Sequence, residues 1–153
     1  MPKYKAHLLT GLFLFIFFVI LVIKFSIFNF NKNLLPVFLG FCLLGSLFPD
    51  IDTKSKIQKI IYSLLFLIIL LLIFLQNWFA LAILVIISFI PILVNHRALT
   101  HKKWFILLVP LVFTFFVLSF NMSIKHEALT SYLFFEIGAL SHIYLDKIVT
   151  KYF

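Results

Sequence analysis

Long apolar segments, separated by short polar stretches, constrain the fold of this chain more than any other feature. A membrane-spanning helix needs about 20 apolar residues, and several segments approach or reach that length. Of the 153 residues, 64% are hydrophobic and 12% are charged, whereas soluble domains are about 45–50% apolar and about 25% charged. We therefore expect an all-α integral membrane helical bundle of about five to six transmembrane segments. The expected segments are 8–28, 34–48, 60–75, 78–94, 104–120 and 128–148.

Short loops join these segments, so segments adjacent in sequence should be antiparallel neighbours in space. Residues 1–153 are expected to form a single transmembrane helical domain. Segment 34–48 is the shortest and contains Pro36, Gly40 and Gly45. It is a tilted span, a half-helix or a re-entrant segment, and its small residues would allow close helix packing.

The distribution of lysine and arginine predicts the orientation in the membrane. With six spans both termini share one face, and ten of the 13 basic residues fall on that face. Since cytoplasmic loops carry an excess of Lys and Arg, we expect a multi-pass protein of the cell (inner) membrane with both termini cytoplasmic. Nucleic acid is not an expected partner, because the basic residues flank apolar segments and form no patch with aromatics. Membrane lipid is the expected anionic partner of this +8 chain.

Four short polar clusters interrupt the apolar sequence, and the predicted topology places all four at the cytoplasmic face. They contain four of the five histidines and three of the five acidic residues. Imidazole and carboxylate groups are common metal ligands. Their gathering at one membrane depth therefore predicts a metal site. The candidate ligands are His7, Asp50, Asp52, His96, His101, His142 and Asp146.

The spacing inside two clusters favours shared ligation. Asp50 and Asp52 follow Pro49, which favours an extended stretch in which residues two apart share a face. His142 and Asp146 are four apart and lie on one helical face, as two ligands of one metal or as a ligand and its orienting carboxylate. Alternatively, the aspartates form a solvated acidic turn, and His142 and Asp146 satisfy each other.

His96 and His101 could bind the same metal ion only if a helix ends between them. On a continuous helix the two side chains would lie roughly 140° apart and could not bind one ion. Arg97 suits a phosphate or carboxylate oxygen, and Thr100 would orient a ligand. The alternative is that His96 and His101 are interfacial histidines beside basic anchors.

The remaining histidine and both glutamates fall outside the clusters. Glu136 lies about 15 Å along its helix from Asp146, in the apolar layer, where an acid is costly and faces the bundle interior. A structural role is our first interpretation, and a relay in a transporter is the alternative. His126 and Glu127 fall on the far side of the membrane, away from the predicted site.

Seven candidate ligands exceed the needs of one tetrahedral ion and favour a site of two or more divalent metal ions, with zinc favoured and manganese second. Such sites favour hydrolysis, because the metals activate water near neutral pH and hold phosphoryl oxygens. In the catalytic roles, Arg97 would stabilise charge on the phosphoryl oxygens, and Asp52 or Asp146 would act as general base. We therefore expect a metal-dependent hydrolase of a phosphate ester or phospholipid-like substrate at the cytoplasmic interface. The alternatives are a metal or proton transporter and a non-catalytic structural membrane protein.

The ordered motifs are similar to those of a known family. Ala-His-Leu-Leu…Gly, Pro-Asp-Ile-Asp, His-Arg-x-x-Thr-His and Gly-x-x-Ser-His-x-x-x-Asp, in that order, resemble the predicted membrane-bound metal-dependent hydrolases, the YdjM-like inner-membrane group. The resemblance runs from His7 to Asp146 and implies a multi-helix membrane protein with a metal site. A more distant likeness, to the helical zinc-dependent phospholipase C class, implies a phosphodiester or phosphomonoester substrate.

Matched position by position, the resemblance implies that all seven candidate ligands bind metal. It also implies supporting roles for Arg97, Thr100 and Ser141. The chain departs from the family pattern at three positions, where the family often has His, Gly and Ser. These positions hold Thr53, Ala98 and Lys102.

Overall fold

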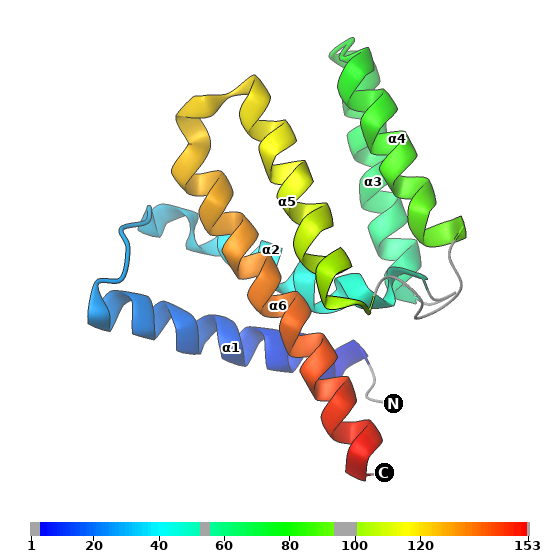
Figure 1. The fold of residues 1–153 in the computed structure, drawn as a ribbon. Coiled ribbons are helices and arrows are strands. Elements are labelled where there is room, and N and C mark those ends of the chain that lie inside the picture. The colour runs from blue at the N-terminus through cyan, green and yellow to red at the C-terminus, as the bar shows by residue number, and fades with distance from the viewer. Residues whose placement is uncertain (1–3, 53–55, 94–100, 153) are drawn as a thin grey trace. The chain divides into compact units, whose positions relative to one another are not determined.

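The computed structural model describes residues 4–52, 56–93 and 101–152, and these are almost entirely helical (Figure 1). The described residues contain no strand, and six α-helices match the six predicted segments, which confirms the all-α class. In chain order, the elements are α1 (Tyr4–Phe25), η1 (Lys32–Leu34), α2 (Leu35–Leu47), η2 (Phe48–Asp52), α3 (Lys56–Phe74), α4 (Trp78–Leu93), α5 (Lys103–Phe120), η3 (Met122–Ile124) and α6 (Lys125–Tyr152).

Two stretches of the described residues are long and apolar enough to cross a membrane, by length and composition. They are Tyr4–Phe25 and Lys32–Ile51. Gln58–Phe74 and Lys103–Ser119 are apolar but shorter. The total of five to six spans stays a prediction.

The chain divides into two compact units. The first comprises Met1–Pro49 and Lys103–Phe153 and holds α1, α2, α5 and α6, whereas the second comprises Asp50–Lys102 and holds α3 and α4. The prediction of one domain over the whole chain stays a prediction.

In the first unit, α2 and α6 pack side by side and in parallel. Phe38 stacks on Phe134 with ring centroids 5.8 Å apart, and two turns later the Ser46 carbonyl accepts a hydrogen bond from the His142 ring. Both pairs are separated by the same number of residues, so the two helices advance together from one contact to the next. α1 runs the opposite way, because Phe15 meets Phe134 and the earlier residue His7 meets His142.

Glycines permit the close approach of α2 and α6. A Cβ atom added at Gly138 would overlap the backbone carbonyl of Cys42, and one added at Gly45 would overlap that of Phe135. The predicted close packing of segment 34–48 is therefore confirmed at Gly45, and Gly138 makes the matching contact from α6. Gly40 has no neighbouring atom within 4 Å of such a Cβ, so this glycine is not needed for the contact.

Two apolar clusters hold the first unit together. Phe15, Phe38, Cys42 and Phe134 form the first, among α1, α2 and α6. In the second, Ile106 of α5 and Ala139 and Ile143 of α6 are buried, with Phe48 and Phe135 against them. Together the clusters fix all four helices of the unit around α6.

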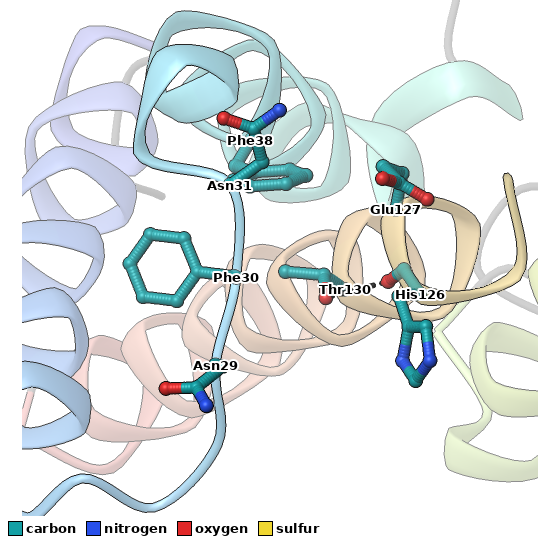
Figure 2. A pocket seen from close by; sticks show the side chains of 7 residues that line it. All are labelled: Asn29, Phe30, Asn31, Phe38, His126, Glu127 and Thr130. Carbon is teal, nitrogen blue, oxygen red and sulfur yellow. Dashed lines mark hydrogen bonds between the residues drawn. The ribbon is translucent and has the colours of Figure 1, made fainter.

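Asparagine side chains cap the short turns that lead into α2 and α6. The Asn31 side-chain oxygen accepts from the Asn33 N–H at 3.1 Å, and that of Asn121 accepts from the Ser123 N–H at 3.0 Å. A pocket of about 330 Å³ lies at this end of the unit, between the α1–α2 connection and the first turns of α6 (Figure 2). It is lined by Asn29, Phe30, Asn31, Phe38, His126, Glu127 and Thr130.

The prediction of an extended stretch at Pro49 is wrong. Residues Phe48–Asp52 form the 3₁₀ helix η2, and Phe48 itself is helical, with φ −58° and ψ −40°. Proline is tolerated at the start of a helix, where its missing N–H has no partner to lose. The Phe48 ring packs against Phe105 and Phe135, with centroids 6.4 and 5.3 Å away, and this burial outweighs the local preference.

In the second unit, α3 and α4 form a helical hairpin. The Tyr62 hydroxyl of α3 donates to the Ser88 carbonyl of α4 at 2.8 Å. The turn contains Gln76 at φ 53°, and the Asn77 side chain caps α4 by accepting from the Ala80 N–H at 3.1 Å.

Candidate metal centre

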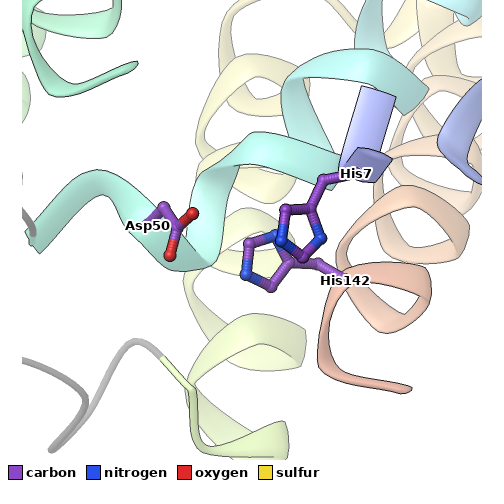
Figure 3. A group of neighbouring side chains, drawn as sticks. All are labelled: His7, Asp50 and His142. Carbon is purple, nitrogen blue, oxygen red and sulfur yellow. The ribbon is translucent and has the colours of Figure 1, made fainter. Parts of the chain in front are cut away.

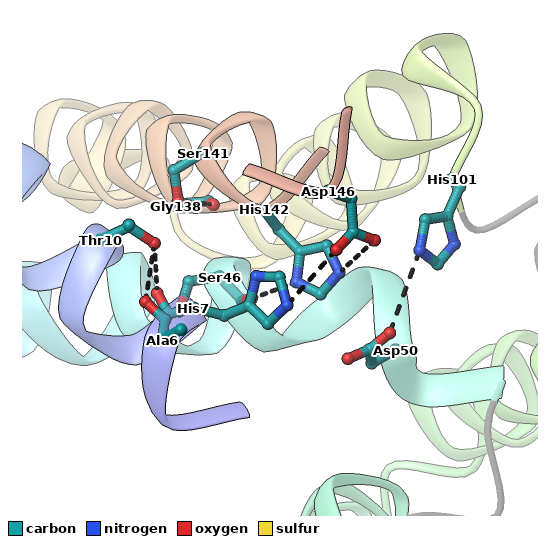
Figure 4. Close-up of polar contacts among 10 residues, drawn as sticks. All are labelled: Ala6, His7, Thr10, Ser46, Asp50, His101, Gly138, Ser141, His142 and Asp146. Atoms are coloured by element: carbon teal, nitrogen blue, oxygen red, sulfur yellow. Dashed lines mark hydrogen bonds and ion pairs between the residues drawn. The ribbon is translucent and has the colours of Figure 1, made fainter. Parts of the chain in front are cut away.

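Three predicted ligands converge in the first unit: His7 from α1, and His142 and Asp146 from α6. The carboxylate of Asp146 faces a nitrogen of each ring (Figure 4). Its Oδ1 is 3.6 Å from His7 Nε2, and its Oδ2 is 3.6 Å from His142 Nε2. The predicted one-turn spacing of His142 and Asp146 therefore places both on one helical face, as expected.

The two imidazole rings are stacked on each other in a buried position. Their centroids are 3.7 Å apart with an interplanar angle of 12° (Figure 3). His7 is 1% exposed and His142 is fully buried. Rings held this tightly keep a fixed direction for their nitrogen atoms, which is a requirement of a specific metal site.

A backbone carbonyl orients His142. Its Nδ1 lies 2.7 Å from the Ser46 carbonyl oxygen, so Nδ1 carries the proton and donates it to that oxygen. The other nitrogen, Nε2, is thereby the acceptor that faces Asp146. Metal-binding histidines usually donate their second ring N–H to a carboxylate or carbonyl in this manner.

The close contact at Gly138 makes this hydrogen bond possible. Gly138 precedes His142 by one helical turn, and a Cβ there would also lie 2.8 Å from the Ser46 backbone nitrogen. On α1, a Cβ at Gly11 would lie 2.9 Å from that of Ser46. Small residues on α1 and α6 thus allow the end of α2 to enter the cluster.

The donor set and its spacing fit a divalent metal ion. The separations of 3.6 Å from carboxylate oxygen to imidazole nitrogen are too long for good hydrogen bonds. Two ligands bound about 2.0–2.1 Å from a tetrahedral ion lie roughly 3.3–3.4 Å from each other. Mixed nitrogen and carboxylate donors are common at zinc.

Asp50 and His101 form an ion pair within the second unit. His101 Nε2 lies 3.9 Å from Asp50 Oδ1 (Figure 4). Asp50 is in η2, and Asp52 is the last residue of that element. His96, Arg97 and Thr100 lie outside the described residues. The structure thus brings three of the seven predicted ligands together in the first unit and two in the second.

Two other predicted residues have defined surroundings. The Ser141 hydroxyl donates to the Gly138 carbonyl at 2.6 Å, within its own helix. Glu136 is 6% exposed, which confirms its interior position. Its carboxylate oxygens have no hydrogen-bond partner among the described residues.

The sequence interpretation missed Ser46, because the group that acts is its backbone carbonyl. A carbonyl leaves no signature in the sequence. The only indirect signal is the small side chain beside Gly45, which marks α2 as able to approach another helix.

Comparison with known proteins agrees with the helical membrane architecture. A family model described as YdjM inner membrane protein matches residues 1–152. No curated protein and no solved structure matches the chain. Because the family match covers nearly the whole length, the chain is a helical membrane protein that belongs to the YdjM inner membrane protein family.

Proposed function

We propose that the protein is a membrane-bound, metal-dependent hydrolase of phosphate esters, and that His7, His142 and Asp146 bind one of its metal ions. The main support for the proposal is that the buried imidazoles of His7 and His142 both face the Asp146 carboxylate. The Ser46 carbonyl fixes the orientation of His142. Zinc is the favoured ion and manganese the second choice.

The position of Asp146 indicates which aspartate binds metal and which acts as general base. Each of its two oxygens faces a histidine, so this residue is better suited to bind metal than to accept a proton. The role of general base then falls to Asp52. A bound divalent cation polarises a phosphoryl oxygen and makes water at the site more acidic. Arg97 would stabilise the negative charge that develops on the phosphoryl oxygens.

Asp50 and His101 are proposed as donors to a further metal ion. Each offers a ligand atom that transition metals accept, and the two atoms lie 3.9 Å apart. That all these residues serve one reaction stays a prediction from the sequence, as does the role of His96.

The same proposal includes the topology of a multi-pass protein with both termini cytoplasmic. It follows from the excess of lysine and arginine on one predicted face. A phosphate ester would then be hydrolysed at the cytoplasmic interface, where a phospholipid-like substrate presents its headgroup.

Metal content of the detergent-purified protein tests the proposal. We expect at least one equivalent of zinc or manganese in the wild type and a loss of metal in His142→Ala. His126→Ala is the matched control, because His126 is exposed at the other end of α6. Hydrolysis of a panel of phosphate monoesters and diesters should follow the metal content. Equal metal content in the wild type and His142→Ala, after incubation with zinc and manganese, would contradict the proposal.

A second candidate function is the transport of a metal ion or proton. Glu136 favours it, because a buried acid without a hydrogen-bond partner among the described residues is costly and is often functional. Metal uptake or proton movement in proteoliposomes, lost in Glu136→Gln, would support transport. Unchanged flux in that variant would exclude Glu136 as a relay.

A further inference from the structure

An apolar groove runs between α1 and α6, beside the metal-ligand cluster. Its volume is about 410 Å³. On α1 its wall includes Thr10, Leu14 and Phe18, which recur every four residues and share one helical face. Because His7 precedes Thr10 by three residues, this ligand lies on the same side of α1 as the groove wall.

The opposite wall is a second stripe, on α6. It includes Ile137, Ser141, Leu145 and Ile148. Since a helix rises about 1.5 Å per residue, this stripe is about 17 Å long. That length is close to the hydrocarbon thickness of one leaflet, which is about 15 Å or half of a ~30 Å bilayer core.

The hydroxyl groups of Thr10 and Ser141 do not make this groove polar. Thr10 donates to the carbonyls of Ala6 and His7 at 3.1 and 2.9 Å, and Ser141 donates to the Gly138 carbonyl. Both are engaged by their own helices, so their remaining surface in the groove is apolar. Such a lining fits a hydrocarbon chain.

A lysine lies against the groove wall. Lys103 Nζ lies 5.3 Å above the ring of Tyr144, which lines the groove, and 3.5 Å from its hydroxyl. Lys5 and Lys147 are exposed close to His7 and Asp146 in sequence. Lysine ammonium groups bind phosphate as point charges. An anionic lipid, with its chain in the groove and its headgroup within reach of Lys103, is the ligand that this arrangement complements.

We propose that the groove binds one acyl chain of a membrane phospholipid whose phosphate lies at the His7–His142–Asp146 cluster. The position of the phosphate rests on the proposed function. The assignment of the groove between α1 and α6 does not, since it follows from the residues that line the groove. The substrate class is thereby narrowed to lipid phosphate esters, and water-soluble phosphate esters are poor ligands.

Lipid binding, measured without turnover, tests this proposal. Native mass spectrometry of the full chain in detergent would compare dipalmitoyl with dihexanoyl phosphatidic acid, which share one headgroup. We expect the wild type to prefer the long chains by about tenfold or more. Leu14→Trp should fill the groove and abolish the preference, while binding of the dihexanoyl lipid and metal content stay unchanged.

The control is Ile16→Trp, which changes an exposed residue of α1 that does not line the groove. It should keep the preference. If Leu14→Trp fails to fold, Ile148→Trp at the other end of the groove replaces it.

Two results would overturn the proposal. One is an unchanged chain-length preference in folded Leu14→Trp or Ile148→Trp. The other is a change of oligomeric mass in these variants, which would assign the groove to a second copy of the chain. A third result would separate the two proposals. If Leu14→Trp loses the chain-length preference but the wild type binds no metal, the proposed function is contradicted and the groove assignment stands.

Discussion

Replacing Gly138 by alanine tests the contact on which the metal-ligand cluster depends. The added Cβ would overlap the Cys42 carbonyl oxygen and lie 2.8 Å from the Ser46 nitrogen. Carbon atoms prefer non-bonded separations of about 3.5–4.0 Å. Both neighbours are backbone atoms of α2 and cannot rotate away, so the two helices must separate by roughly 1 Å or more to restore such separations.

This separation has two costs. Overpacking of a well-packed contact typically costs about 1–3 kcal/mol. The hydrogen bond from His142 to the Ser46 carbonyl, now 2.7 Å, would also be stretched beyond a useful length, which costs about 1 kcal/mol more. The better helix propensity of alanine offsets up to about 1 kcal/mol of this destabilisation. We therefore expect a net destabilisation of about 1–3 kcal/mol.

Gly40→Ala is the matched control, because it makes the same chemical change in α2 with nothing within 4 Å of the new Cβ. It should be neutral or stabilising by up to about 1 kcal/mol. Thermal unfolding in detergent would rank the two variants, and metal titration would report on the cluster. Equal unfolding temperatures and equal metal affinities for Gly138→Ala and Gly40→Ala would refute the close approach of α2 and α6.

Three further predictions follow from the packing and the ligand cluster. Removal of metal by a chelator should lower the unfolding temperature, because an ion that binds only the folded state at 100 times its Kd contributes about 2.7 kcal/mol; the shift should vanish in His142→Ala. Phe134→Ala, in the core of the first unit, should destabilise by about 3–5 kcal/mol in the same assay, whereas exposed Phe115→Ala should change stability little. Glu136→Leu should raise the unfolding temperature, since it removes a buried acid with no hydrogen-bond partner among the described residues, a cost of about 1–3 kcal/mol; a lower temperature would show that the carboxyl group stabilises the fold.

The helices were predictable because the signal for each is local. Apolar runs of helical length, separated by polar turns, give all six α-helices and the membrane class without knowledge of any contact. The pairing of His142 with Asp146 was predictable for the same reason, since one helical turn separates them. Pro49 shows the limit of local rules: its effect on Phe48 was overridden by the burial of that ring against Phe105 and Phe135.

The sequence by itself determined which residues are able to bind metal and which segments are apolar, because composition and helical periodicity decide both. Only the tertiary structure decided that His7 lies on His142 and that the Ser46 carbonyl holds the second ring. These contacts join residues far apart in the chain, and they depend on how closely two helices approach. That distance is set where Gly138 meets a carbonyl of another helix, and a pattern read along one chain does not identify the partner atom.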